Sequence, residues 1–168
     1  EPLLKETVAR IAADPLARWI GIGDYCEFIN RSDPRFNPAA LAPWIRVKDL
    51  GDLAKAQAER FVEIVSPITS KCLCLLKGNH EEANYKHYER DVYSDIVSAI
   101  KRDGKFRADE RLALGYTGWL RLMFRRGSSS SGDNTITFNL HHGFTGGRMA
   151  GGKVNALARA FAGGAVVT

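Results

Sequence analysis

Apolar residues that recur every three or four positions predict three helices in the first hundred residues. In the first helix this spacing is carried by Leu4, Val8 and Ile11, which fall on one face of an α-helix. Asp14-Pro15 ends this helix, because a proline in the interior would remove a backbone hydrogen bond. The three predicted helices cover residues 3–13, 52–66 and 82–100.

The third predicted helix carries several tyrosines. Tyr85 and Tyr88 lie in line with aliphatic residues at spacings of three and four, which predicts that both rings pack against the core. Tyr93 falls off this stripe, which favours an exposed ring. The aliphatic members of the stripe are Val92, Ile96 and Ile100.

Continuous apolar runs predict strands between the helices. The run Cys72–Leu76 is typical of a strand that is buried on both faces. Residues 127–132, Gly-Ser-Ser-Ser-Ser-Gly, predict a flexible hairpin tip rather than a linker between domains. The predicted strands cover 18–22, 72–76, 112–125 and 135–140, with another beginning at Ala165 after a short helix over 154–161. This alternation of helices and strands indicates an α/β or mixed α/β protein.

Residues 25–50 form a long stretch without a regular pattern. The stretch is rich in Pro, Asn and Asp, which favour turns over helices and strands. We therefore predict an irregular excursion that is anchored to the rest of the protein by Trp44 and Ile45. The pattern does not reveal whether residues 31–50 act as a lid.

Composition narrows the class of protein. The 168 residues are 45% hydrophobic and 26% charged, as in a soluble globular domain. No apolar run reaches the length of about 18 residues that crosses a bilayer. The N-terminus lacks the basic stretch and apolar core of a signal peptide. We therefore expect a cytoplasmic protein that has no membrane partner.

The charge and the cysteines add little that is specific. The net charge is +5, but Lys and Arg are spread along the chain. A solvated, mildly basic surface therefore explains the charge better than a polyanionic partner does, although nucleic acid stays a possible partner. Three cysteines cannot all pair, and Cys72 and Cys74 lie in an apolar run. Reduced, buried thiols are expected, which fits the cytoplasm.

Three short blocks with reactive side chains follow predicted strands. They are residues 23–27 (Gly-Asp-Tyr-Cys-Glu), 78–81 (Gly-Asn-His-Glu) and 141–143 (His-His-Gly). Reactive groups of α/β proteins stand at strand ends, where a rigid sheet holds variable loops. Asp, Asn and His together suit Mn, Fe or Zn better than Ca. Each block alone could be an ordinary turn or a structural histidine, but their order and positions together favour a functional site.

These blocks resemble those of the calcineurin-like metallophosphoesterases. The family pattern is Asp-x-His, Gly-Asp-x-x-Asp, Gly-Asn-His-Asp/Glu, a lone His often followed by Gly, and Gly-His-x-His. The middle three are matched here by Gly23-Asp24 with Glu27, by 78–81, and by His142-Gly143. The resemblance implies a four-layer α/β/β/α sandwich with two mixed β-sheets, and it covers residues 16–168.

The resemblance also implies a role for each matched residue. Asp24 would bridge two divalent metal ions, and Asn79 and His142 would ligate the second. His80 would lie beside the substrate and donate a proton to the leaving oxygen or stabilise the phosphoryl charge. Glu27 stands where the family often has an Asp that is oriented toward this His. The implied activity is metal-dependent hydrolysis of a phosphomonoester, a phosphodiester or nucleic acid.

Substrate contacts are expected from two further positions. Arg148 lies in a glycine-rich loop that we expect close to the metal site, where it or Lys153 would meet a substrate phosphate. A surface loop is an alternative for this segment. His141, next to His142, is assigned to substrate binding. The substrate, the identity of the two metals among Mn, Fe and Zn, and the oligomeric state are not disclosed by the sequence.

The first and last blocks of the family pattern are absent from the chain. No Asp-x-His precedes Asp24, and no Gly-His-x-His follows Val167. We therefore expect residues 1–168 to be a single metallophosphoesterase domain that is truncated at both ends. Such a fragment would bind metal weakly or at one site only and be inactive alone.

Two other functional classes stay open. Residues 147–153 fit the Gly-x-x-x-x-Gly-Lys of a P-loop, which binds nucleotide phosphates through backbone amides. However, Val154 stands where a Ser or Thr hydroxyl should hold magnesium, and the loop does not follow its strand directly. The third class is a non-catalytic binding module that is built on the same fold.

Overall fold

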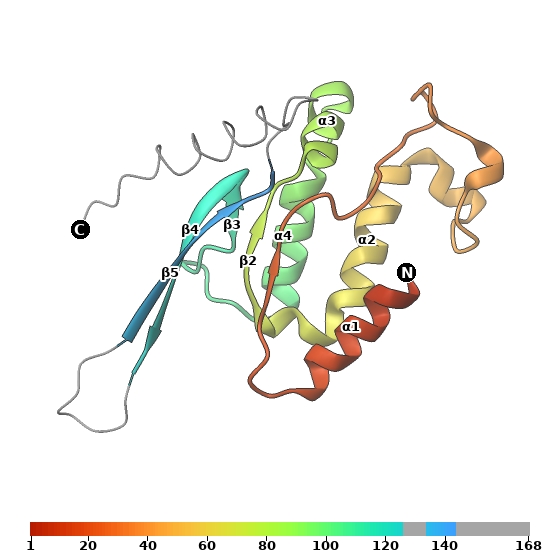
Figure 1. Ribbon diagram of the computed structural model, residues 1–168. Coiled ribbons are helices and arrows are strands. Elements are labelled where there is room, and N and C mark those ends of the chain that lie inside the picture. The colour runs from red at the N-terminus through yellow and green to blue at the C-terminus, as the bar shows by residue number, and fades with distance from the viewer. Residues whose placement is uncertain (126–133, 144–168) are drawn as a thin grey trace, which may run out of the picture. The chain divides into compact units, whose positions relative to one another are not determined.

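The computed structural model describes residues 1–125 and 134–143 of a mixed α/β protein with two small sheets (Figure 1). The chain forms two compact units, residues 1–116 and 117–168. The expected single domain stays a prediction. The hairpin tip at 127–132, the helix at 154–161 and the strand from Ala165 lie outside the described residues.

The sheet of the first unit consists of three parallel strands in the order β1-β2-β3. Ile20 of β1 pairs with Cys74 of β2, and Leu75 of β2 pairs with Ala113 of β3. The first two strands confirm the sequence prediction, although β1 is shorter than expected. Their bounds are β1 Trp19–Gly21, β2 Cys72–Leu76 and β3 Ala113–Gly115.

Side chains satisfy terminal backbone groups of several helices in this unit. Asp52 caps α2, since its carboxylate accepts from the backbone N–H of Lys55 at 2.9 Å. At the end of α1 the ammonium of Lys71 donates to the carbonyl oxygens of Ile11 and Asp14, at 2.6 Å each. The bounds are α1 Pro2–Ala13, α2 Leu53–Val65, α3 Asn79–Tyr88 and α4 Val92–Asp103, with 3-10 turns at Pro38–Ala40, Val47–Gly51 and Ser66–Lys71. Among the described residues no helix is long and apolar enough to span a membrane.

The helix predicted over 82–100 is wrong, because two helices cover this region. Glu89 adopts a left-handed conformation with φ 53° and ends α3. Asp91 then caps α4, and its carboxylate accepts from the backbone N–H of Ser94 at 3.0 Å. The apolar residues keep the same spacing on both sides of Glu89, so periodicity alone did not reveal the break between the two helices.

The break also reverses the predicted exposure of the tyrosines. Tyr85 is 50% exposed and Tyr88 is 37% exposed, whereas Tyr93 is only 7% exposed. The hydroxyl of Tyr93 donates to the carbonyl oxygen of Leu75 at 2.8 Å and accepts from the backbone N–H of Gly115 at 3.2 Å. Tyr93 therefore ties α4 to both β2 and β3.

The core of the first unit lies where α1, α2 and α4 meet β2. Leu75, Val92, Ile96 and Ile100 are completely buried there, and Val8 of α1 joins them. In Figure 1, α2 and α4 run alongside the strands, and α3 stands beyond the carboxyl end of β2. Burial of such side chains stabilises the fold by about 1.5–3 kcal/mol each.

The second unit contains an antiparallel hairpin of β4, Thr117–Phe124, and β5, Asn134–His141. A strand over 135–140 is thereby confirmed. The single strand predicted over 112–125 is wrong, because it divides at Tyr116 into β3 and β4, which belong to different sheets. Gly115 has φ +69° at this point, a conformation that disfavours continuation of a strand.

Candidate active site

The loop after β1 lies against the first turn of α3. Strands β1 and β2 are parallel neighbours, so their carboxyl ends meet at one edge of the sheet. Asp24 follows β1, and Asn79 and His80 form the first positions of α3 after β2. The backbone N–H of His80 donates to Oδ1 of Asp24 at 3.0 Å, across 56 residues of sequence. Two of the three predicted blocks are therefore in direct contact.

The carboxylate of Glu81 joins these two segments. It accepts from the backbone N–H groups of Gly78 at 2.7 Å, Asp24 at 3.0 Å and Tyr25 at 2.8 Å. Its side chain is completely buried. The bond to Gly78 is half of a capping box, in which the third helical residue caps the helix start. Glu81 therefore determines where the Asp24 loop lies relative to α3.

Gly78 is required by the closeness of this contact. A Cβ atom at this position would lie 2.2 Å from Oδ1 of Asp24 and 2.3 Å from its backbone nitrogen. Any other residue would therefore push the loop away from the helix. Gly23, with φ 89°, and Asp24, with φ 53°, take the left-handed conformations that the turn needs.

His80 has a defined ring orientation. Its Nδ1 lies 3.2 Å from the carbonyl oxygen of Cys26. Because a carbonyl oxygen only accepts, this contact places a proton on Nδ1 and leaves Nε2 for other chemistry. The side chains of Asp24 and Asn79 are exposed beside it. The arrangement offers one carboxylate, one amide and one oriented imidazole at a single sheet edge.

Burial raises the pKa values of two side chains in the loop between Asp24 and Phe28. Desolvation, with smaller contributions from the negative charges of Glu81 and Glu27, raises the pKa of the Cys26 thiol to about 12. Desolvation also raises the pKa of Tyr25, whose hydroxyl donates to the carbonyl oxygen of Leu76 at 2.8 Å. Cys26 is therefore a neutral thiol and not a nucleophile. All three cysteines are free, and Cys72 and Cys74 are buried as predicted.

We expect Cys26 to resist alkylation in the native protein although it is only partly buried. At pH 8 a thiol with a pKa of about 12 has roughly one thiolate in ten thousand, against roughly one in ten at a pKa of 9. Iodoacetamide labelling followed by peptide mass spectrometry measures this, with the urea-unfolded protein as the control. Labelling should accelerate as the pH rises toward 12. Fast labelling of native Cys26 at pH 8 would contradict the described loop.

Glu27 lies at the end of this loop and is exposed. In the described residues the partner of Nδ1 of His80 is the carbonyl oxygen of Cys26. The role of Glu27 in orienting His80 therefore stays a prediction. Glu27 lines a cavity together with Tyr25 and Cys26.

The remaining predicted site residues belong to the second unit. His141 ends β5, and its Nδ1 accepts from the backbone N–H of Gly143 at 2.9 Å. His142 follows and is partly buried. Their roles in substrate and metal binding stay predictions. Arg148 and the P-loop-like residues 147–153 lie outside the described residues.

The candidate site in the first unit offers the types of ligand atom that divalent metal ions bind. Oδ1 of Asp24 accepts from the N–H of His80, and carboxylate oxygens and amide oxygens, such as those of Asp24 and Asn79, are ligand types that Mn accepts. Within residues 1–125 and 134–143, no three His, Cys, Asp or Glu side chains are grouped to hold a metal ion. In this part of the chain the carboxylate and the amide would have to be completed by further ligands.

The sequence reading assigned no role to two residues that build this site. Glu81 is the last residue of the block 78–81, and its position three residues after Gly78 is the spacing of a helix cap, which could have identified it. Asn84 is buried, and its Nδ2 lies 3.4 Å from the carbonyl oxygen of Phe28. No local pattern indicates that contact.

Comparisons with known proteins do not place this chain in a family. No family model matches it, and neither a curated protein nor a solved structure matches it.

Proposed function

We propose that this protein is a calcineurin-like metallophosphoesterase that hydrolyses phosphoester bonds with two divalent metal ions, Mn, Fe or Zn. The four-layer sandwich with two mixed sheets is part of this proposal. One observation carries it: the Asp24 carboxylate accepts from the backbone of His80 at 3.0 Å, at the carboxyl ends of two parallel strands. Glu81 holds both segments in place.

In this proposal Asp24 and Asn79 hold metal, and the assignment of His142 as a further ligand stays a prediction. Bound divalent ions supply Lewis-acid activation of water and of the phosphoryl oxygens. His80 faces the phosphoryl group with Nε2, because Nδ1 is engaged by the carbonyl oxygen of Cys26. In its protonated form it donates to the leaving oxygen, which would otherwise depart as an alkoxide.

The test is hydrolysis of bis(4-nitrophenyl) phosphate and of 4-nitrophenyl phosphate by the natural full-length protein. We expect turnover with added Mn(II), its loss in EDTA and its recovery when Mn(II) is restored. The preferred ester shows whether the protein is a diesterase or a monoesterase. Turnover that is insensitive to EDTA, or no turnover by a folded protein that binds Mn(II), would argue against the proposal. Nucleotide binding without transition metal would instead favour the P-loop reading.

A further inference from the structure

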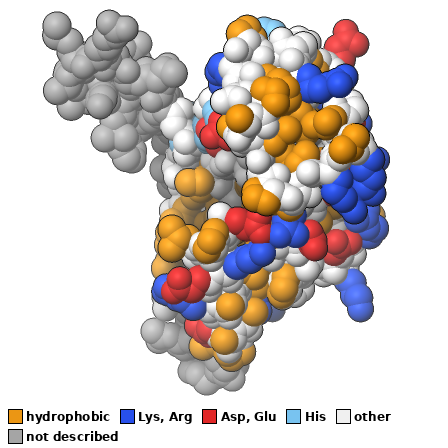
Figure 2. All heavy atoms as spheres, turned by 90° about the vertical axis from the view of Figure 1, so that its right-hand side faces the viewer, with side chains coloured by type: hydrophobic (Ala, Val, Ile, Leu, Met, Phe, Trp, Pro, Cys, Tyr) orange, Lys and Arg blue, Asp and Glu red, His pale blue; other side chains and the backbone are white. Residues whose placement is uncertain are grey.

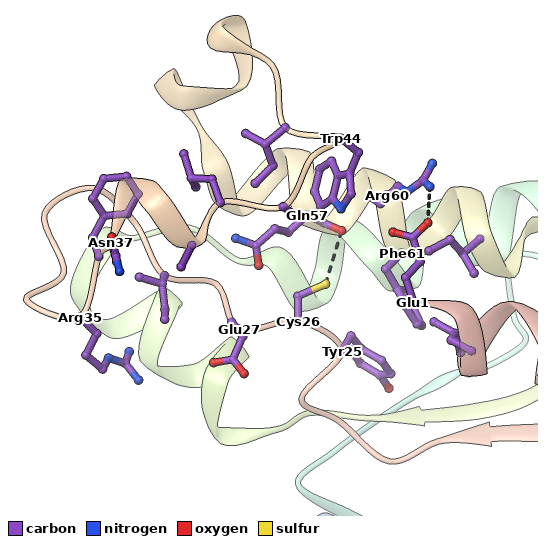
Figure 3. Close-up of a pocket in the computed structure, with 18 residues that line it drawn as sticks. Glu1, Tyr25, Cys26, Glu27, Arg35, Asn37, Trp44, Gln57, Arg60 and Phe61 are labelled. Carbon is purple, nitrogen blue, oxygen red and sulfur yellow. Dashed lines mark hydrogen bonds and ion pairs between the residues drawn. The ribbon is translucent and has the colours of Figure 1, made fainter.

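A cavity of about 390 Å³ lies beside the candidate active site, between α2 and the segment 29–45 (Figure 3). Tyr25, Cys26 and Glu27 form one of its walls. The carbonyl oxygen of Cys26 lies 3.2 Å from Nδ1 of His80, so the cavity begins at the loop that orients this ring. Its volume is in the range of small-ligand sites, which begins at about 300 Å³.

Aromatic rings supply much of the wall. Phe36 and Trp44 come from the irregular segment, while Tyr25 and Phe61 come from the loop and from α2. The rings of Tyr25 and Phe61 lie 4.9 Å apart and are tilted by 36°. Figure 2 shows the side of the molecule that is on the right in Figure 1. Hydrophobic side chains gather on the upper part of this side, where Figure 1 places the irregular segment. Flat, rigid rings of this kind favour a flat ligand.

Hydrogen-bond donors without a described partner line the same cavity. The side-chain oxygens of Gln57 and Asn37 accept from the backbone N–H groups of Phe28 and Ala39, at 2.9 and 3.0 Å. In the described part of the chain neither NH₂ group has a partner. A ligand with acceptors, such as ring carbonyl oxygens, can therefore pair with these two amides.

We propose that this cavity binds the base of a nucleoside phosphoester, a flat ring with carbonyl acceptors such as thymine or uracil. This inference rests on the proposed function, because the phosphoryl group would lie at Asp24 and His80. A base stacks on the aromatic wall and accepts from the two amides. The cavity thereby selects nucleoside esters over simple alkyl esters.

Two diesters with the same leaving group test this selection. Thymidine 5′-(4-nitrophenyl) phosphate and methyl 4-nitrophenyl phosphate share the leaving group and differ in the nucleoside, whose base the cavity would bind. With Mn(II) we expect kcat/KM to be about tenfold higher for the thymidine ester, the effect of one stacked base. Trp44→Ala should reduce this ratio about tenfold, and Trp44→Phe should largely preserve it. Val47→Ala is the matched control, since Val47 lies three residues after Trp44 but is 86% exposed and does not line the cavity.

Equal kcat/KM for the two esters, or an unchanged ratio in Trp44→Ala, would overturn the inference and leave the hydrolase proposal intact. If neither ester is hydrolysed, the hydrolase proposal fails, and binding of thymidine itself is then measured by ligand-observed NMR. Binding that weakens in Trp44→Ala and persists in Asp24→Asn would support the base site. No binding would overturn it.

Discussion

Replacement of Glu81 by alanine should lower the free energy of unfolding by about 3–5 kcal/mol. The carboxylate accepts three backbone N–H groups, and all three would lose their partner in a buried place. An unsatisfied buried donor costs about 1–3 kcal/mol, and partial entry of water reduces the sum. Urea unfolding followed by circular dichroism measures the loss.

Glu82→Ala is the matched control for Glu81→Ala. Glu82 is the neighbouring carboxylate on the same helical turn, is partly buried, and pairs with Lys77 at 2.5 Å and Lys86 at 3.2 Å. Exposed ion pairs contribute about 0–1 kcal/mol, and these pairs are partly exposed, so this variant should lose far less stability than Glu81→Ala. Glu81→Gln keeps one oxygen and should fall between the two alanine variants. Equal stability of Glu81→Ala and Glu82→Ala would show that the carboxylate does not hold the loop.

His80→Ala should reduce metal-dependent turnover by about a hundredfold to ten-thousandfold, the usual contribution of a general acid. The loss should be larger for an ester with an alcohol leaving group than for one with 4-nitrophenolate, which departs without a proton. The ring is bonded only to the Cys26 carbonyl oxygen among the described residues, so stability should change little. His87→Ala is the control, because His87 is an exposed histidine of the same helix. An equal loss for both leaving groups would contradict the acid role.

The variant Asp24→Asn removes the negative charge of Asp24 but can keep the hydrogen bond from the backbone of His80. Asparagine tolerates the left-handed conformation at this position, and its side-chain oxygen can still accept from the backbone of His80. We therefore expect a normally folded variant whose Mn(II) affinity and turnover both fall. Calorimetric titration with Mn(II) measures the affinity. Retention of wild-type affinity would remove Asp24 from the metal site.

Local pattern was sufficient for several elements. α1 and α2 follow from helical period and end signals, and β2 follows from a continuous apolar run. The break at Glu89 was missed because the apolar residues of α3 and α4 keep one period across it, and the phase of that period placed Tyr85 inward and Tyr93 outward. The division at Gly115 was missed because two strands with one apolar pattern entered different sheets.

The same distinction between local pattern and tertiary structure holds for the candidate site. The residue types at the ends of β1 and β2, and the glycines before Asp24 and Asn79, are readable from local sequence because turns and caps act over a few residues. The contact between Asp24 and His80, and the cavity beside α2, depend on parallel pairing of strands that are far apart in the chain. Such pairing is decided by burial of the whole core, so only the tertiary structure brought Glu81, Tyr25 and Trp44 to this end of the sheet.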